Sequence, residues 1–176
     1  GRVYAWLKQK GIGKEDFVLI NLTRGVLPVV AIVGILKAGA AFALVEENYA
    51  PERIEYIRKD CGCKSEINRN AWEEILKCEP LDGHEQTDAH DAAYAIYTSG
   101  TTGNPKGVLH EYGNIEECIR SVNYEGNPII SEKDRGALLA PMNFVATIMM
   151  LFCVLYCGGC KLFIASYLSK GLTHVF

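Results

Sequence analysis

The chain has 176 residues, of which 49% are hydrophobic and 22% are charged, and its formal net charge is −3. This composition is typical of a globular protein and excludes a disordered or fibrous chain. Because there is no basic excess, we expect no nucleic-acid partner, and the apolar run at 144–157 is shorter than the roughly 20 residues of a membrane-spanning helix.

The apolar pattern predicts alternating strands and helices along the chain. Helical spacing begins at once, with Val3, Trp6 and Leu7. In chain order we then expect a strand at 17–22, a helix at 26–37 ended by Gly39, a strand at 40–45, a helix at 51–60, a strand at 65–67, a helix at 71–78, strands at 92–97 and 108–109, a helix at 114–122, a strand at 137–139, a buried helix at 144–156 and a strand at 160–165.

Such an alternation, with nearly continuous apolar strands, predicts an α/β fold with a mostly parallel sheet covered by helices on both faces. Ligands of such sheets bind at the carboxyl ends of the strands. The chain begins without Met inside a helical pattern and stops just after a strand. We therefore expect a single domain that is a piece of a longer protein.

The seven cysteines are an odd number, and most lie within apolar or helical patterns. Free thiols in such patterns behave as small hydrophobic side chains, which favours a reducing cytoplasm. Cys153, Cys157 and Cys160 have a spacing that could suit a metal, but no fourth ligand lies nearby. Core packing is therefore the preferred interpretation.

Residues 79–91 form an acidic stretch, EPLDGHEQTDAHD, that contains His84 and His90 among five carboxylates. A metal site is one interpretation of this composition. The Pro, Gly and Asp residues are also those of a solvated connector, which is the interpretation we favour.

The segment YTSGTTGNPKG, residues 97–107, directly follows the strand expected at 92–97. Glycines allow backbone N–H groups to approach an anion closely, while hydroxyls and an ammonium add further donors. The order of residues differs from the GxxxxGK[ST] and GxGxxG patterns. The segment therefore predicts a polyphosphate-binding loop of another kind, and an ordinary polar turn does not explain its NPKG ending.

This segment resembles the signature phosphate loop of the adenylate-forming superfamily, which includes peptide-synthetase adenylation domains, acyl-CoA ligases and luciferases. Residues 36–57, LKAGAAFALVEENYAPERIEYI, are similar to an adenylation-domain pattern. Residues 143–166 resemble the family's Phe-Asp-x-Ser helix, Gly-Gly turn and following strand. Together these segments favour an N-terminal fragment of a non-ribosomal peptide synthetase-type adenylation domain.

The resemblance implies that a carboxylic acid is activated with ATP and Mg²⁺ as an acyl-adenylate and then passed to a carrier protein's phosphopantetheine thiol. It also implies that the catalytic residues lie beyond Phe176, so that no catalytic residue and no metal ligand is assigned here and the isolated chain is expected to be inactive. The residues expected to hold the ATP phosphates are Thr98, Ser99, Gly100, Thr101, Thr102, Gly103 and Lys106.

The chain departs from the family pattern at Val145, where amino-acid-activating members have an Asp that pairs with the substrate's α-ammonium. A buried ammonium that faces valine would lack its charge partner. Either the substrate has no α-amino group or a residue outside this chain supplies the acid. The expected substrate pocket comprises Phe144, Val145, Ala146 and Met149, with a plain core role as the alternative for Phe144 and Met149.

Two other functions remain open from the sequence. The first is an acyl-CoA or D-alanine ligase of the same superfamily, and the difference lies in whether the acceptor is CoA or a carrier protein. The second is a non-catalytic nucleotide-binding module, which the departure at Val145 suggests.

Overall fold

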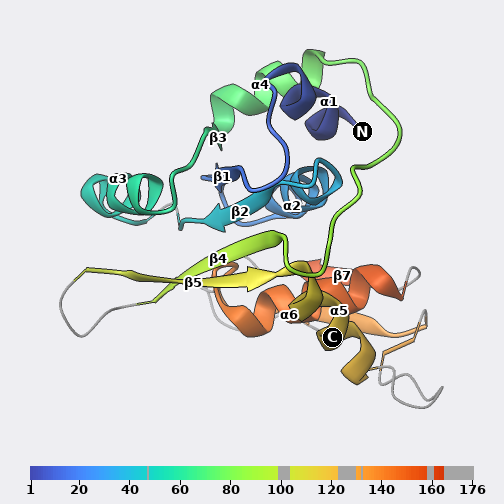
Figure 1. Cartoon of the computed structure of the whole chain (residues 1–176). Helices are drawn as coiled ribbons and strands as arrows, with labels where there is room; N and C mark the ends of the chain where they lie inside the picture. The colour runs from blue at the N-terminus through green and yellow to red at the C-terminus, as the bar shows by residue number, and fades with distance from the viewer. Residues whose placement is uncertain (47, 99–103, 123–129, 132, 158–160, 165–176) are drawn as a thin grey trace.

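The computed structural model describes residues 1–46, 48–98, 104–122, 130–131, 133–157 and 161–164 (Figure 1). The helices are α1 (Arg2–Gln9), α2 (Val26–Lys37), α3 (Pro51–Asp60), α4 (Arg69–Lys77), α5 (Tyr112–Val122) and α6 (Val145–Tyr156). The strands are β1 (Phe17–Ile20), β2 (Ala41–Leu44), β3 (Ser65–Ile67), β4 (Ala92–Thr98), β5 (Lys106–Glu111), β6 (Arg135–Leu138) and β7 (Lys161–Ile164).

Five strands form the main sheet in the order β3-β1-β2-β4-β5. The first four are mutually parallel, and β5 pairs antiparallel with β4. β6 and β7 form a separate parallel pair. The short connection between β4 and β5 explains the antiparallel pairing, because a parallel crossover needs about a dozen residues or more. The expected α/β class with a mostly parallel sheet is confirmed.

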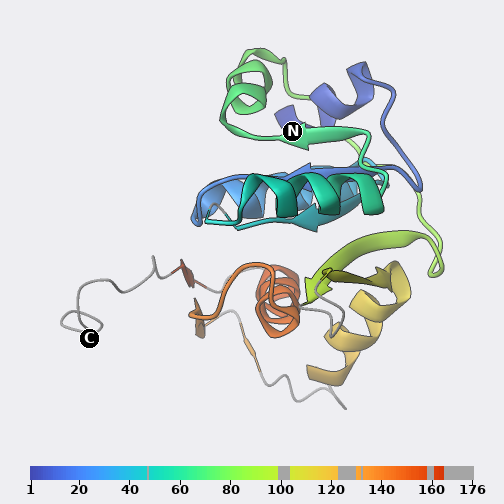
Figure 2. The ribbon, with the colours of Figure 1, turned by 90° about the vertical axis from the view of Figure 1, so that its left-hand side faces the viewer.

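Side chains alternate between the two faces of the sheet, as the pleat of a strand requires. Val18, Phe42 and Tyr94 belong to the larger core, which α1, α2, α4 and α6 also line. Leu19 and Ala43 belong to a second core on the opposite face, where α3 contributes Ile57. Helices therefore cover both faces, as expected, and Figure 2 shows α5 and α6 grouped beside β4, away from α1 and α4.

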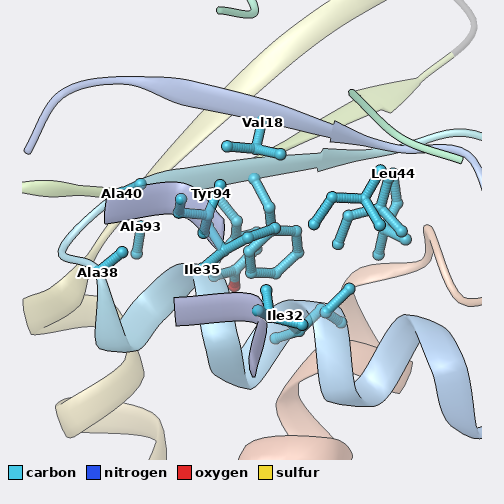
Figure 3. Close-up of a cluster of buried hydrophobic side chains, with 14 of the residues drawn as sticks. Val18, Ile32, Ile35, Ala38, Ala40, Leu44, Ala93 and Tyr94 are labelled. Atoms are coloured by element: carbon cyan, nitrogen blue, oxygen red, sulfur yellow. The ribbon is translucent and has the colours of Figure 1, made fainter. Parts of the chain in front are cut away.

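Helix α2 packs on the larger core through Ile32 and Ile35, which point toward strand residues such as Tyr94 in Figure 3. The helix ends as expected at Gly39, whose φ of +70° lies in the left-handed region that favours glycine. The N–H of Gly39 donates to the carbonyl of Leu36, which closes the last turn.

Helix α6 differs from the buried helix that its composition predicted. One face is buried and includes Ile148, Leu151 and Phe152. Met150 and Tyr156, in contrast, are exposed. A helix that is apolar all round carries no periodicity in its sequence, so the pattern could not distinguish its buried face from its exposed one. Among the described residues, no helix is long and apolar enough to span a membrane.

Helices α1 and α2 approach closely at Gly34. A Cβ added at Gly34 would lie 2.4 Å from both Cβ and Cγ1 of Val3. We expect Gly34→Ala to lower the free energy of unfolding by about 1 to 2 kcal/mol, because overpacking outweighs the gain of about 1 kcal/mol in helix propensity. Urea unfolding followed by circular dichroism measures this change.

Gly13→Ala is the matched control, since an added Cβ there would meet only the Ala38 carbonyl oxygen at 3.8 Å. Its unfolding free energy should change by no more than about 0.5 kcal/mol. Equal stabilities for the two variants would contradict the close packing at Gly34.

Candidate functional site

The carboxyl ends of β1, β2 and β4 lie along one edge of the sheet because these strands are parallel. At this edge β4 ends with Thr98, which is exposed although the preceding six residues of the strand are buried. Thr98 lies directly opposite Lys106, the first residue of β5. The β4–β5 hairpin therefore brings the two ends of the expected phosphate loop together (Figure 1).

Two of the seven expected phosphate-binding residues, Thr98 and Lys106, can be placed, whereas residues 99–103 lie outside the described part of the chain. Lys106 is exposed. The ion pairs formed among the described residues do not include it. An ammonium and a hydroxyl at the carboxyl end of a buried parallel strand are chemically suited to a phosphate group.

Tyr97 fixes the base of this loop. Its hydroxyl donates to Oδ2 of Asp60, the last residue of α3, at 2.7 Å. Burial, together with this hydrogen bond, raises the pKa of Tyr97, so its hydroxyl stays protonated. The ring lies against Gly107 on β5, where an added Cβ would come within 2.9 Å of the ring carbon Cζ. Glycine at 107 therefore allows the ring to cross the hairpin.

The segment before α6 is held at the same edge by two long-range contacts. The Arg24 guanidinium, which follows β1, donates to the carbonyl oxygens of Leu138 and Ala140. Asn143 Nδ2 donates to the hydroxyl of Tyr49, which follows β2, at 2.5 Å. These contacts bring the beginning of α6 to the edge where β1, β2 and β4 end.

The expected substrate residues occupy the beginning of α6. Phe144 precedes the helix and is 53% exposed, and Met149 is 38% exposed. The alternative interpretation of these two side chains as core residues therefore does not describe this structure. Val145 is half-buried against the larger core, and Ala146 is exposed. That these four residues form the substrate pocket stays a prediction. Phe144 directly precedes α6, and the other three lie at the beginning of the helix.

Two of the three cysteines considered for a metal site, Cys153 and Cys157, can be placed in the structure. The Sγ atoms of Cys153 and Cys118 lie 3.8 Å apart between α6 and α5, and the Cys157 thiol contacts the Ile130 carbonyl oxygen at 3.0 Å. Cys160 lies outside the described residues. Within the described ranges, no cluster of three or more His, Cys, Asp or Glu side chains is arranged to hold a metal ion.

The acidic stretch at 79–91 forms neither helix nor strand and is attached to the N-terminal part of the chain. Glu85 accepts hydrogen bonds from Lys8 Nζ at 2.8 Å and from the Tyr4 hydroxyl at 2.9 Å. Both bonds lower the pKa of Glu85, and the bond from Lys8 has the larger effect. Asp91 pairs with Lys14 at 2.9 Å. Ion pairs of Glu85 and Asp91 therefore hold this stretch against the N-terminal part of the chain.

Residues 2–82 and 66–171 match the family described as AMP-binding enzyme. The chain belongs to the AMP-binding enzyme family. This confirms the resemblance to the adenylate-forming superfamily on which the sequence interpretation rests.

Similar proteins agree with this membership. The chain is 35% identical over 170 residues to surfactin synthase subunit 1 of Bacillus subtilis (strain 168), a match that covers 89% of the chain and 5% of that protein. It also resembles the solved Klebsiella oxytoca NpsA N-terminal subdomain in complex with 3-hydroxyanthranilyl-AMSN, with a TM-score of 0.79 and 27% identity over 98% of the chain and 45% of that structure.

A third relative is NpsA-ThdA, an artificially fused adenylation–PCP di-domain from Klebsiella oxytoca. Its TM-score is 0.81 and its identity 25%, with 98% of this chain and 36% of that chain covered. The chain thus spans less than half the length of each of these relatives.

Sequence reasoning did not foresee the residues that hold this site together. Tyr97 and Asp60, Tyr49 and Asn143, and Arg24 and the Leu138 carbonyl are far apart in the chain. No local pattern predicts such pairs. Tyr97 alone carried a signal, because it stands at the junction of the strand and the phosphate loop.

The contact between Tyr97 and Gly107 predicts the effect of one substitution on this AMP-binding family member. Gly107→Ala should displace the Tyr97 ring and lower the free energy of unfolding by about 1 to 3 kcal/mol. The same substitution in a Tyr97→Leu background should cost less, because the ring is gone. A double-mutant cycle from urea unfolding measures the coupling. Additive effects would show that the ring and Gly107 do not interact.

Proposed function

We propose that the longer protein containing this chain activates a carboxylic acid with ATP as an acyl-adenylate and transfers the acyl group to a carrier-protein phosphopantetheine thiol. In the first step the substrate carboxylate attacks the α-phosphorus of ATP, and pyrophosphate leaves. The observation that carries this proposal is the placement of Thr98 opposite Lys106 at the carboxyl end of β4. Membership of the AMP-binding enzyme family supports it.

In this proposal the hairpin binds the β- and γ-phosphates of ATP. Lys106 supplies a positive charge, Thr98 a hydroxyl donor, and Ser99, Gly100, Thr101, Thr102 and Gly103 further donors. Mg²⁺ is typically held by substrate phosphates and few protein groups, so it accompanies ATP and has no assigned ligand in this chain. The contribution of these residues is positioning and charge stabilisation.

The domain organisation and the acceptor are part of the same proposal. Residues 1–176 form part of one AMP-binding domain, in which 79–91 connects its first and second halves. A carrier protein is the expected partner, which the fused adenylation–PCP relative supports. The free thiols among the described cysteines fit a cytoplasmic protein.

The substrate we propose is an acid without an α-amino group, such as an aryl acid. Val145 stands at the beginning of α6 and packs partly against the larger core, so this position offers no carboxylate to an ammonium. The NpsA relative was solved with an aryl-type ligand, 3-hydroxyanthranilyl-AMSN, which supports the same class. An acyl-CoA or D-alanine ligase is the second candidate, and the acceptor used in the second step distinguishes it.

Lys106 gives the most direct functional test. In the full-length protein, Lys106→Ala should reduce ATP–pyrophosphate exchange by about 100-fold, because one preorganised charge contact to the phosphates is lost. Lys77→Ala, which removes an exposed lysine of α4, is the matched control and should retain exchange. The isolated 176-residue chain should show none. An unaffected Lys106→Ala enzyme would refute the phosphate-loop assignment.

Position 145 tests the substrate class. A panel of aryl, hydroxy, keto, fatty, β-amino and α-amino acids should show highest exchange in the full-length protein with acids that lack an α-amino group. Val145→Asp should shift the preference toward α-amino acids, since a carboxylate then faces the ammonium. Ala146→Asp places the same charge one residue away and should not. A wild-type preference for α-amino acids would contradict this substrate assignment.

A further inference from the structure

Two cysteines face each other directly after α3. The helix ends at Asp60, and the Sγ atoms of Cys61 and Cys63 lie 2.7 Å apart. Gly62 between them has a φ of +60°, in the left-handed region, and the Cys63 N–H donates to the Arg58 carbonyl at 3.0 Å. The turn that ends α3 therefore brings the two sulfur atoms into contact.

The turn geometry suits a bond between the two sulfurs. Residues two apart in sequence span at most about 7 Å when extended, and the turn at Gly62 shortens this distance. Disulfides require Cα atoms roughly 4.4–6.8 Å apart. Both thiols are half-buried, so small reagents can reach them. A Cβ added at Gly62 would meet no atom within 4 Å. The left-handed backbone conformation, and not close packing, therefore favours glycine at this position.

The surroundings make the two thiols unequal. A hydrogen bond from the Cys63 thiol lowers the pKa of Cys61, and burial opposes this effect only in part. The same bond raises the pKa of Cys63, which keeps its proton, and burial adds to this effect. Arg58 lies close enough to Cys63 to oppose that rise, whereas Glu66 adds to it. Cys61 is therefore the better nucleophile.

We propose that Cys61 and Cys63 form a redox-active dithiol that a low-molecular-weight disulfide oxidises to an intramolecular disulfide. The Cys61 thiolate attacks one sulfur of the small disulfide, whose S–S bond breaks and releases one thiol. Cys63 then loses its proton to solvent and attacks the Cys61 sulfur, which releases the second thiol. Two electrons pass from the protein dithiol to the small disulfide, and the protein gains one S–S bond.

A partly exposed disulfide in such a small ring belongs to the readily reduced class rather than to the permanent structural class. It can therefore form and be reversed within a reducing compartment. This proposal does not depend on the function assigned to the phosphate loop.

The chain contains its own control pair. Cys118 and Cys153 also face each other, with sulfurs 3.8 Å apart, but both are buried. Burial raises the pKa of Cys153 to about 12, which keeps that thiol protonated and unreactive. Oxidation should therefore select the pair at 61 and 63.

The test uses the 176-residue chain in glutathione buffers that range from fully reduced to fully oxidised. Free thiols are labelled with a maleimide in denaturant, and the tryptic peptide of residues 60–64 is weighed by mass spectrometry. In oxidised glutathione it should be unlabelled and lighter by two hydrogens, and in reduced glutathione doubly labelled. The peptides of Cys118 and Cys153 should stay labelled throughout. A doubly labelled 60–64 peptide in every buffer would overturn the proposal.

Single serine variants test the order of attack. Cys63→Ser removes the second thiol and should accumulate a mixed disulfide with glutathione at Cys61. Cys61→Ser leaves Cys63, whose pKa burial still raises after the bond to Cys61 is lost, and should accumulate less. Circular dichroism of both variants should match that of the unchanged chain. Equal glutathione attachment to the two variants would overturn the assignment of Cys61 as the nucleophile.

Discussion

Burial of β4 on both faces is the constraint on which the rest of the structure depends. From Ala92 to Tyr97 every residue of the strand is buried, so helices or neighbouring strands must cover it on each side. Tyr94 stacks on Phe42 of β2 with ring centroids 5.4 Å apart and reaches Phe152 of α6 at 6.0 Å. The strand is thus fixed between the N-terminal and C-terminal halves of the fold.

The candidate site follows from where this buried strand ends. Because β4 cannot shift without exposing its apolar residues, Thr98 and the paired Lys106 emerge at a fixed place on the carboxyl edge. Arg24 and Tyr49, which follow β1 and β2, attach the segment before α6 to the same edge. The expected phosphate-binding and substrate-binding residues therefore converge through core packing and a few polar contacts.

Periodicity and the glycine-rich motif were enough to predict the fold class and the chain position of the loop. The helix at 26–37 has the predicted bounds, because Gly25 and Gly39 flank a clear apolar run there. The strand at 65–67 also has its predicted bounds, although two of its three residues are polar. The exposed face of α6 was not predicted, because a continuous apolar composition has no periodicity. The antiparallel direction of β5 was not predicted either, although the short connection from β4 indicates it. The polar contacts at the carboxyl edge of the sheet join residues far apart in the chain, so no local sequence pattern indicates them.

The most direct test of this account is a crystal structure of the full-length protein with bound ATP. We expect a β- or γ-phosphate oxygen within hydrogen-bonding distance of Lys106 Nζ, with the polyphosphate lying at the carboxyl end of β4 beside Thr98. Phosphates bound at another edge of the sheet, with Lys106 directed into solvent, would contradict it.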